Sequence, residues 1–162
     1  MTVHTNVQPV PSIQDALQLL HADHRTLRSS LNDCARVTAS EADGGSAADR
    51  SGLISRLAAM LTAHLQMKQE LVYPLLDAVA AERDEALQSH APMLALVQAL
   101  SLPDLDDLDF AAQLTAMTEA VQAHLVHEEQ RLWPALPSEE LQALGSRLAM
   151  RRAQLMGDQG VD

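Results

Sequence analysis

Apolar residues recur along this chain in alternating steps of three and four, which is the spacing of one face of an α-helix. Four such stripes follow one another between residues 12 and 137. The first two consist of Ile13, Leu17, Leu20, His24, Leu27, Leu31 and Cys34, and of Leu53, Leu57, Met60, His64, Met67, Leu71 and Leu75. The last two consist of Leu87, His90, Leu94 and Val97, and of Phe110, Leu114, Met117, Val121, His124 and Glu128. The pattern predicts four helices, each with a histidine on its apolar face.

Capping residues and helix breakers predict where the first two helices begin and end. Ser12-Ile-Gln-Asp15 resembles a capping box, so we expect the first helix to begin there. A loop is predicted over residues 38–50, which are rich in small and polar side chains and include Gly44-Gly45. The second helix is then expected to begin near Ser51 and to kink or end near Pro74.

The third and fourth helices are predicted over residues 83–101 and from the acidic run 104–107 to near Pro134 or Pro137. Pro92 leaves two arrangements of the third helix open. The proline either kinks a continuous helix just after His90 or marks the start of a new helix with Ser89 near its cap. Whether Pro92 displaces His90 from the apolar face depends on which arrangement forms.

These elements predict an all-α fold, an up-down antiparallel four-helix bundle over residues 12–137. Aromatic residues make up only 2% of a chain that is 47% apolar, so the core is expected to consist of Leu, Ala, Val and Met. Residues 1–11 are predicted to be a flexible N-terminus. Residues 138–162 are predicted to be a short fifth helix that caps the bundle, with Leu141, Leu144, Leu148 and Leu155 on one side, and a tail.

Charge and cysteine content exclude several classes of function. A net charge of −11 disfavours a nucleic-acid partner, because nucleic-acid binding requires clustered Lys and Arg. No apolar run reaches the roughly 18 residues of a membrane span, so no membrane partner is expected, and the N-terminus does not resemble a signal peptide. Cys34 is the only cysteine and forms no intrachain disulfide. We therefore expect a cytoplasmic protein.

The candidate chemistry lies in the four inward histidines. Four buried imidazoles in one bundle each require a partner, and a metal ion or facing carboxylates would supply it. Glu128 follows His124 by one helical turn, a spacing that suits two ligands of one ion. The segment around His64 repeats this pattern, but Lys68 stands where Glu128 stands in the second copy. A protonated lysine cannot bind a metal.

These motifs resemble the haemerythrin-like (HHE cation-binding) domains. The resemblance rests on Asp23-His24-Arg25, His64 with Tyr73-Pro74-Leu75-Leu76, His90, and His124-Leu-Val-His-Glu128-Glu129 with Trp133-Pro134. It implies a four-helix bundle that holds a non-haem di-iron centre for binding dioxygen or nitric oxide, or for iron sensing and handling. It also implies that His24 and His64 serve one iron, that His90 and His124 serve the other, and that Glu128 bridges them. Lys68 and Gln69 stand where the family usually has two glutamates, so one bridge is missing.

Three arrangements of Lys68 remain open from the sequence. Its ammonium pairs with Glu128 and replaces one metal, extends to the surface, or loses its proton and acts as a ligand or nucleophile. His21, His127 and Glu129 are candidate residues around the site that orient ligands or flank them. Tyr73 and Trp133 are expected to pack at the end of the bundle.

Three functional hypotheses follow. The first is an iron-binding protein with ligands His24, His64, His90, His124 and Glu128, whose partners are a metal ion and a small diatomic molecule. Its centre holds two irons as in the family, or one or none because of Lys68. The second is a metal-free bundle with a Lys68–Glu128 ion pair that acts as a structural or interaction module. The third, a non-haem iron oxidase or oxygenase, ranks last because the sequence shows no substrate-pocket signature.

Overall fold

The computed structural model describes residues 15–41 and 47–158, and their regular structure is entirely helical. The α-helices are α1 (Ala16–Glu41), α2 (Ala47–Leu71), α3 (Ala80–Gln88), α4 (His90–Leu100), α5 (Asp107–His127) and α6 (Leu141–Asp158). Short 3₁₀ helices cover Tyr73–Leu75, Asp77–Val79, Trp133–Ala135 and Ser138–Glu140, and a π-helix covers Glu128–Leu132. The predicted all-α class is confirmed. Among the described residues, no helix has both the length and the apolar character needed to cross a bilayer.

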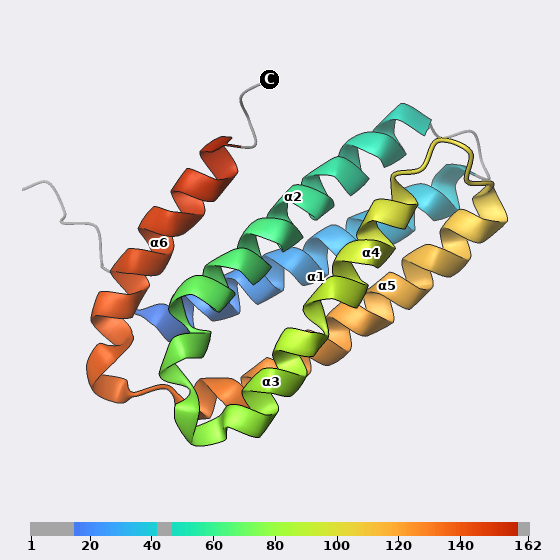
Figure 1. Ribbon diagram of the computed structural model, residues 1–162. Helices are drawn as coiled ribbons and strands as arrows, with labels where there is room; N and C mark the ends of the chain where they lie inside the picture. The colour runs from blue at the N-terminus through green and yellow to red at the C-terminus, as the bar shows by residue number, and fades with distance from the viewer. Residues whose placement is uncertain (1–14, 42–46, 159–162) are drawn as a thin grey trace, which may run out of the picture.

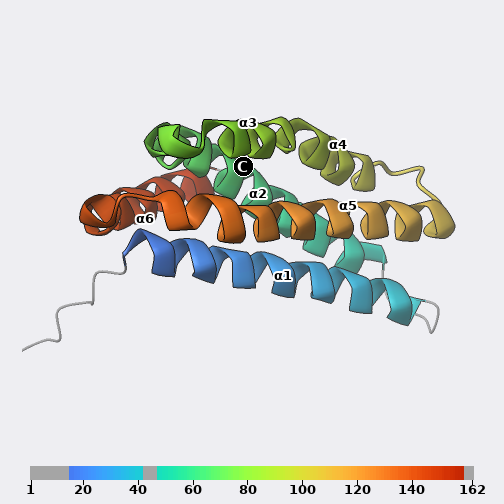
Figure 2. The same cartoon turned by 90° about the horizontal axis from the view of Figure 1, so that it is seen from below.

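The helices form an antiparallel four-helix bundle in which α3 and α4 together occupy one position (Figure 1). Helix α1 packs against α2 and α5, and α4 packs against α2 and α5 from the opposite corner. Helix α6 lies outside this bundle, against α1 and α2 (Figures 1 and 2). It contributes Leu144, Leu148 and Leu155 to the core, and with 18 residues it is longer than the short cap expected from the sequence.

The first two helices differ from their predicted ends. A capping box does begin α1, but Asp15 is its cap: Asp15 Oδ1 accepts from the backbone N–H of Gln18, and Gln18 Oε1 accepts from that of Asp15. The helix therefore begins at Ala16, and the predicted start at Ser12 lies outside the described residues, as does the segment 1–11. The predicted loop 38–50 was too long, because α1 continues to Glu41 and α2 begins at Ala47.

Of the two arrangements left open for residues 83–101, the structure has the second: the helix is interrupted at Ser89, which is the N-cap position of α4. Pro92 has no N–H to donate to the carbonyl of Gln88, and its ring would clash there, so a regular helix is disfavoured at this point. As the first turn of a new helix, α4 tolerates the proline. His90 stays buried after the break, whereas Leu87, expected to face inward, is 39% exposed.

The apolar core consists of two clusters of buried side chains separated by a polar layer. One cluster includes Leu20, Met67, Leu132 and the core leucines of α6. The other includes Leu27, Leu61, Val121 and Leu125. Along each long helix the polar residues of the layer lie between these two groups. The bundle therefore encloses its histidines on both sides with hydrocarbon.

Candidate metal centre

Six polar side chains of the layer are buried, with exposed fractions between 0% and 4%. They are His24 on α1, His64 and Lys68 on α2, His90 on α4, His124 on α5, and Glu128 at the start of the π-helix. Removing polar groups from water is costly unless each one finds a partner. The contacts within this layer therefore indicate which groups are satisfied by the protein and which are left for a ligand.

Lys68 and Glu128 form an ion pair at the centre of the layer. Lys68 is fully buried and donates to Glu128 Oε1, and its Nζ lies 3.1 Å from His124 Nε2. Of the three arrangements left open for Lys68, the structure has the pairing with Glu128 and not the extension to the surface. Burial lowers the pKa of Lys68, and the charge of Glu128 opposes that shift. Burial alone would raise the pKa of Glu128, but the charge of Lys68 and the contacts with His124 and His24 together outweigh burial and hold this pKa well below its usual value.

His24 and His64 face each other, with ring centroids 5.2 Å apart. His24 Nδ1 lies 2.7 Å from Glu129 Oε1, so this nitrogen carries the proton and donates to the carboxylate. Arg28 donates to both oxygens of Glu129 and holds the carboxylate in place. The Nε2 lone pair of His24 is thereby directed into the layer.

His64 also has a carboxylate beside its Nδ1, but at a longer distance and without a direct hydrogen bond. Its Nδ1 lies 3.5 Å from Asp23 Oδ2, and Arg152 donates to the other oxygen of Asp23. Burial, with the nearby charge of Lys68, lowers the pKa of His64 to about 3, so the imidazole is neutral at physiological pH. A neutral imidazole is the form that binds metal ions.

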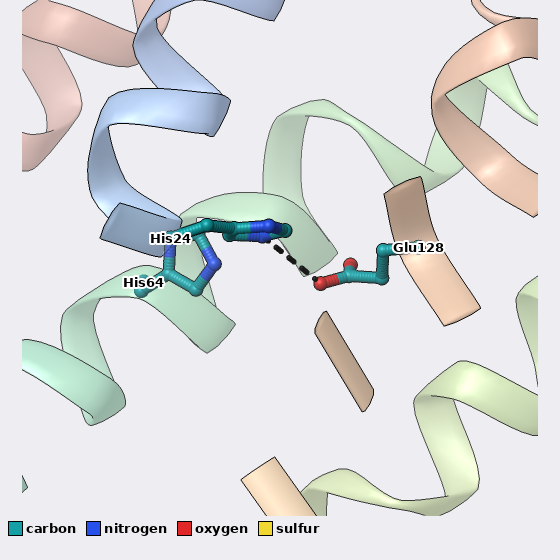
Figure 3. Close-up of side chains that lie close together, drawn as sticks. All are labelled: His24, His64 and Glu128. Carbon is teal, nitrogen blue, oxygen red and sulfur yellow. Dashed lines mark ion pairs between the residues drawn. The ribbon is translucent and has the colours of Figure 1, made fainter. Parts of the chain in front are cut away.

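Three buried nitrogens of these rings have no hydrogen-bond partner among the described residues: Nε2 of His24 and both Nδ1 and Nε2 of His64. His24 Nε2 lies 3.5 Å from Glu128 Oε1, with the His64 ring beside it (Figure 3). One ligand atom from each of these three residues can be chosen so that all lie within 4.8 Å of one another. Two atoms bound about 2.1 Å from a tetrahedral ion are about 3.4 Å apart, so this spacing suits ligands of one metal. We call these three residues the His24–His64 half of the centre.

The opposite half, formed by His90 and His124, is already satisfied by the protein. The two rings lie 5.0 Å apart between centroids. His90 Nε2 is 3.0 Å from the hydroxyl oxygen of Tyr73, and His124 Nε2 faces the Lys68 ammonium. The Nδ1 atoms contact the side chains of Gln69 at 3.3 Å and Ser89 at 2.8 Å. Both nitrogens directed into the layer are therefore engaged by protein groups.

A family model describes most of this chain. The Hemerythrin HHE cation binding domain matches residues 15–136, which includes every residue of the polar layer. The chain belongs to the haemerythrin family. No curated protein and no solved structure matches it. Membership in a cation-binding family agrees with the unpartnered nitrogens and the facing carboxylate of the His24–His64 half.

This haemerythrin-family chain brings Glu128 and Glu129 to opposite edges of the same imidazole. Glu128 faces Nε2 of His24 and Glu129 contacts Nδ1. The helix widens to a π-helix at these residues, with the backbone N–H of Trp133 donating to the carbonyl of Glu128. Pro134 forbids the regular α-helical ladder one residue later. The π-helix that begins with the two glutamates thus lies directly before the Trp133-Pro134 pair.

Four further candidate residues have the following places around the centre. Tyr73 was expected only to pack at the bundle end, but its hydroxyl donates to Glu128 Oε2 at 2.8 Å. Trp133 packs on the His24 ring, with centroids 5.7 Å apart. His21 is exposed and does not line the centre. His127 is half-buried, and its Nε2 lies 3.0 Å from the backbone oxygen of Glu82.

Sequence reasoning also missed the polar partners of the imidazoles. Arg28, Ser89 and Arg152 were not identified as site residues, and Asp23 was recognised only as part of a motif. The adjacency of Asp23 to His24 was a usable signal. No local signal could have predicted Arg152, because it lies on α6, 129 residues away from Asp23 in the chain.

Proposed function

We propose that this protein binds a single iron ion through His24, His64 and Glu128. The supporting observation is the pair of buried Nε2 atoms that lack a partner among the described residues and face a carboxylate. Two imidazoles and one carboxylate form a ligand set typical of non-haem ferrous iron. In this proposal the Lys68 ammonium takes the place that a second cation has in the di-iron centre implied by the resemblance.

Glu128 suits this shared arrangement because one carboxylate accepts several partners. Its two oxygens offer about four lone-pair sites. Oε1 accepts from Lys68 and faces His24 Nε2, while Oε2 accepts from Tyr73. The same carboxylate is therefore available to one ion while it remains paired with an ammonium. The nearby positive charge should weaken metal binding relative to a centre with two bridging carboxylates.

These three residues would hold a ferrous ion with few enough ligands to leave room for a small molecule, and we propose that the protein binds dioxygen or nitric oxide. The protein's own residues would bind the ion, keep the His64 imidazole neutral and enclose the site with apolar side chains on both sides of the layer. The function would then be dioxygen or nitric oxide binding, or iron sensing. A reducing cytoplasm suits this role and the buried free thiol of Cys34.

A metal-free structural or interaction module is the second candidate, and the Lys68–Glu128 ion pair favours it. Lys68 already compensates the charge of Glu128 inside the bundle. A buried ion pair with additional hydrogen bonds is a self-sufficient arrangement. No contact among the described residues adds specific support for an oxidase or oxygenase, so we do not propose that activity.

The metal content of the purified protein, produced in iron-replete medium, separates these functions. We expect about one iron per chain in the wild type and about two in Lys68→Glu, which supplies the missing carboxylate. Lys68→Met is the matched control, because it removes the ammonium without adding a ligand, and should stay near one. A metal-free wild type that gains iron only as Lys68→Glu would support the second candidate. Two irons in the wild type would contradict the substitution of an ammonium for a metal.

A further inference from the structure

Each imidazole of the His24–His64 half is backed by a carboxylate that is itself held by an arginine. For His24 the carboxylate is that of Glu129 and the arginine is Arg28, and both lie within the residues that match the family model. For His64 they are Asp23 and Arg152. Arg152 lies on α6, beyond the matched residues 15–136. A helix outside the family domain therefore supplies one of the two arginines behind the centre.

Asp23 needs this arginine to stay in contact with His64. Asp23, His64 and Arg152 line a pocket of about 180 Å³ between α1, α2 and α6, which is room for several water molecules. An unrestrained carboxylate would turn into this pocket to be hydrated. Arg152 instead holds one oxygen of Asp23, while the other stays 3.5 Å from His64 Nδ1.

We propose that Arg152 is a positioning residue for the metal centre, and this inference rests on the proposed function. By holding Asp23 against His64, it keeps the imidazole proton on Nδ1 and the Nε2 lone pair directed toward the ion. Carboxylate partners of metal-binding histidines fix the tautomer and strengthen the imidazole as a donor. Helix α6 is thus part of the centre and not only a cover over the apolar core.

Arg151 offers a matched control on the same helix. It forms an ion pair with Glu70, with Nε 2.7 Å from Oε2, and so docks α6 on α2 in the same way. Glu70 is exposed and lies outside the polar layer. If Arg152 only fastened α6 to the bundle, its removal and that of Arg151 should have similar consequences.

The first test compares the metal-free wild type with Arg152→Gln and Arg151→Gln by ¹⁵N NMR of the histidine rings. We expect His64 to carry its proton on Nδ1 in the wild type and in Arg151→Gln, and to become a mixture of tautomers in Arg152→Gln. Arg152→Lys, which keeps the charge, should restore the wild-type tautomer. Equal tautomer populations in both Gln variants would overturn the proposal, as would a wild-type His64 protonated on Nε2.

The second test measures binding of ferrous iron to the same proteins without oxygen. Arg152→Gln should bind about 10- to 100-fold more weakly, the usual effect of losing an outer partner of a ligand. Arg151→Gln should bind as the wild type does. Equal affinities in the two variants would show that Arg152 has no role in the centre. A wild type that binds no iron would overturn the proposed function, and the NMR comparison would still decide whether Arg152 controls His64.

Discussion

The two halves of the polar layer contain the same imidazoles in different surroundings. In the His24–His64 half, both Nδ1 atoms face carboxylates and both Nε2 atoms lack a partner among the described residues. In the His90–His124 half, the Nδ1 atoms contact an amide and a hydroxyl, and the Nε2 atoms contact a phenol and an ammonium. The histidines alone therefore do not define a metal site, because their partners decide which of them are available.

The difference also explains how one lysine is tolerated in the interior. An ammonium provides one positive charge and three hydrogens to donate, so it satisfies both Glu128 and His124. A metal ion would provide more charge and would need anionic ligands to offset it. Among the described residues, the His90–His124 half contributes no carboxylate of its own, and its outer partners are neutral. The ammonium therefore suits this half, whereas the carboxylate-backed half suits a metal.

The largest effect should come from removing the charge of Lys68. Lys68→Met would leave Glu128 buried without its counter-charge, and should lower the free energy of unfolding of the metal-free protein by about 3–5 kcal/mol. Urea denaturation measures this loss. The double variant Lys68→Met/Glu128→Gln should recover most of it, because neither charge then remains. Unchanged stability in Lys68→Met would show that the pair contributes little.

Substituting one histidine from each half tests their difference in metal binding. His64→Gln should weaken ferrous iron binding on the order of 100-fold or more, about 2.7 kcal/mol, because it removes a ligand. His90→Gln should leave the affinity near that of the wild type. Both histidines are buried, so the two variants have a comparable packing cost. Calorimetric titration provides the affinities, and equal losses would contradict the assignment of the ion to one half.

Acid should destabilise the metal-free protein through both halves. The pKa values of His64 and His90 are both lowered to about 3, by burial and by the charge of Lys68. Below pH 6.5 each of these imidazoles is protonated in the unfolded chain but stays neutral in the folded chain. The free energy of unfolding therefore falls as the pH drops from 6.5 toward 3. Each histidine contributes a slope of up to about 1.4 kcal/mol per pH unit. His90→Leu and His64→Leu should each make the free energy of unfolding less dependent on pH, and unfolding curves measured between pH 7 and 5 test this. A flat profile in the wild type would contradict these pKa shifts.

The smallest of these effects concerns Tyr73. Burial and the charge of Glu128 raise the pKa of this phenol above its usual value, so it stays protonated and donates to Glu128. Tyr73→Phe keeps the ring and removes the donor, and should cost about 2 kcal/mol in the free energy of unfolding. Iron binding at the His24–His64 half should persist. A thermal shift measures the change in stability, and the metal content shows whether iron still binds. Loss of iron would contradict the description of Tyr73 as a partner of the His90–His124 half.

Much of the fold could be predicted because helical periodicity is local. The stripes that contain His24, His64, His90 and His124 identified the inward face of each helix, and all four side chains are buried. The break before α4 was open in the sequence because Pro92 is compatible with both a kink and a new helix. The position of α6 was not predictable, because its leucine stripe specifies a buried face and not the helices that cover it.

The sequence by itself determined the helical class, the family and the presence of Lys68 one turn after His64. Only the tertiary structure decided which partner each of these groups meets. Glu129 reaches His24 across 105 residues of chain, and Arg152 reaches Asp23 across 129. Such contacts depend on the angle and the height at which helices pack, and side-chain spacing along one helix carries no information about either. The four histidines occupy similar positions in their sequence stripes, but the packing of the helices gives them different partners.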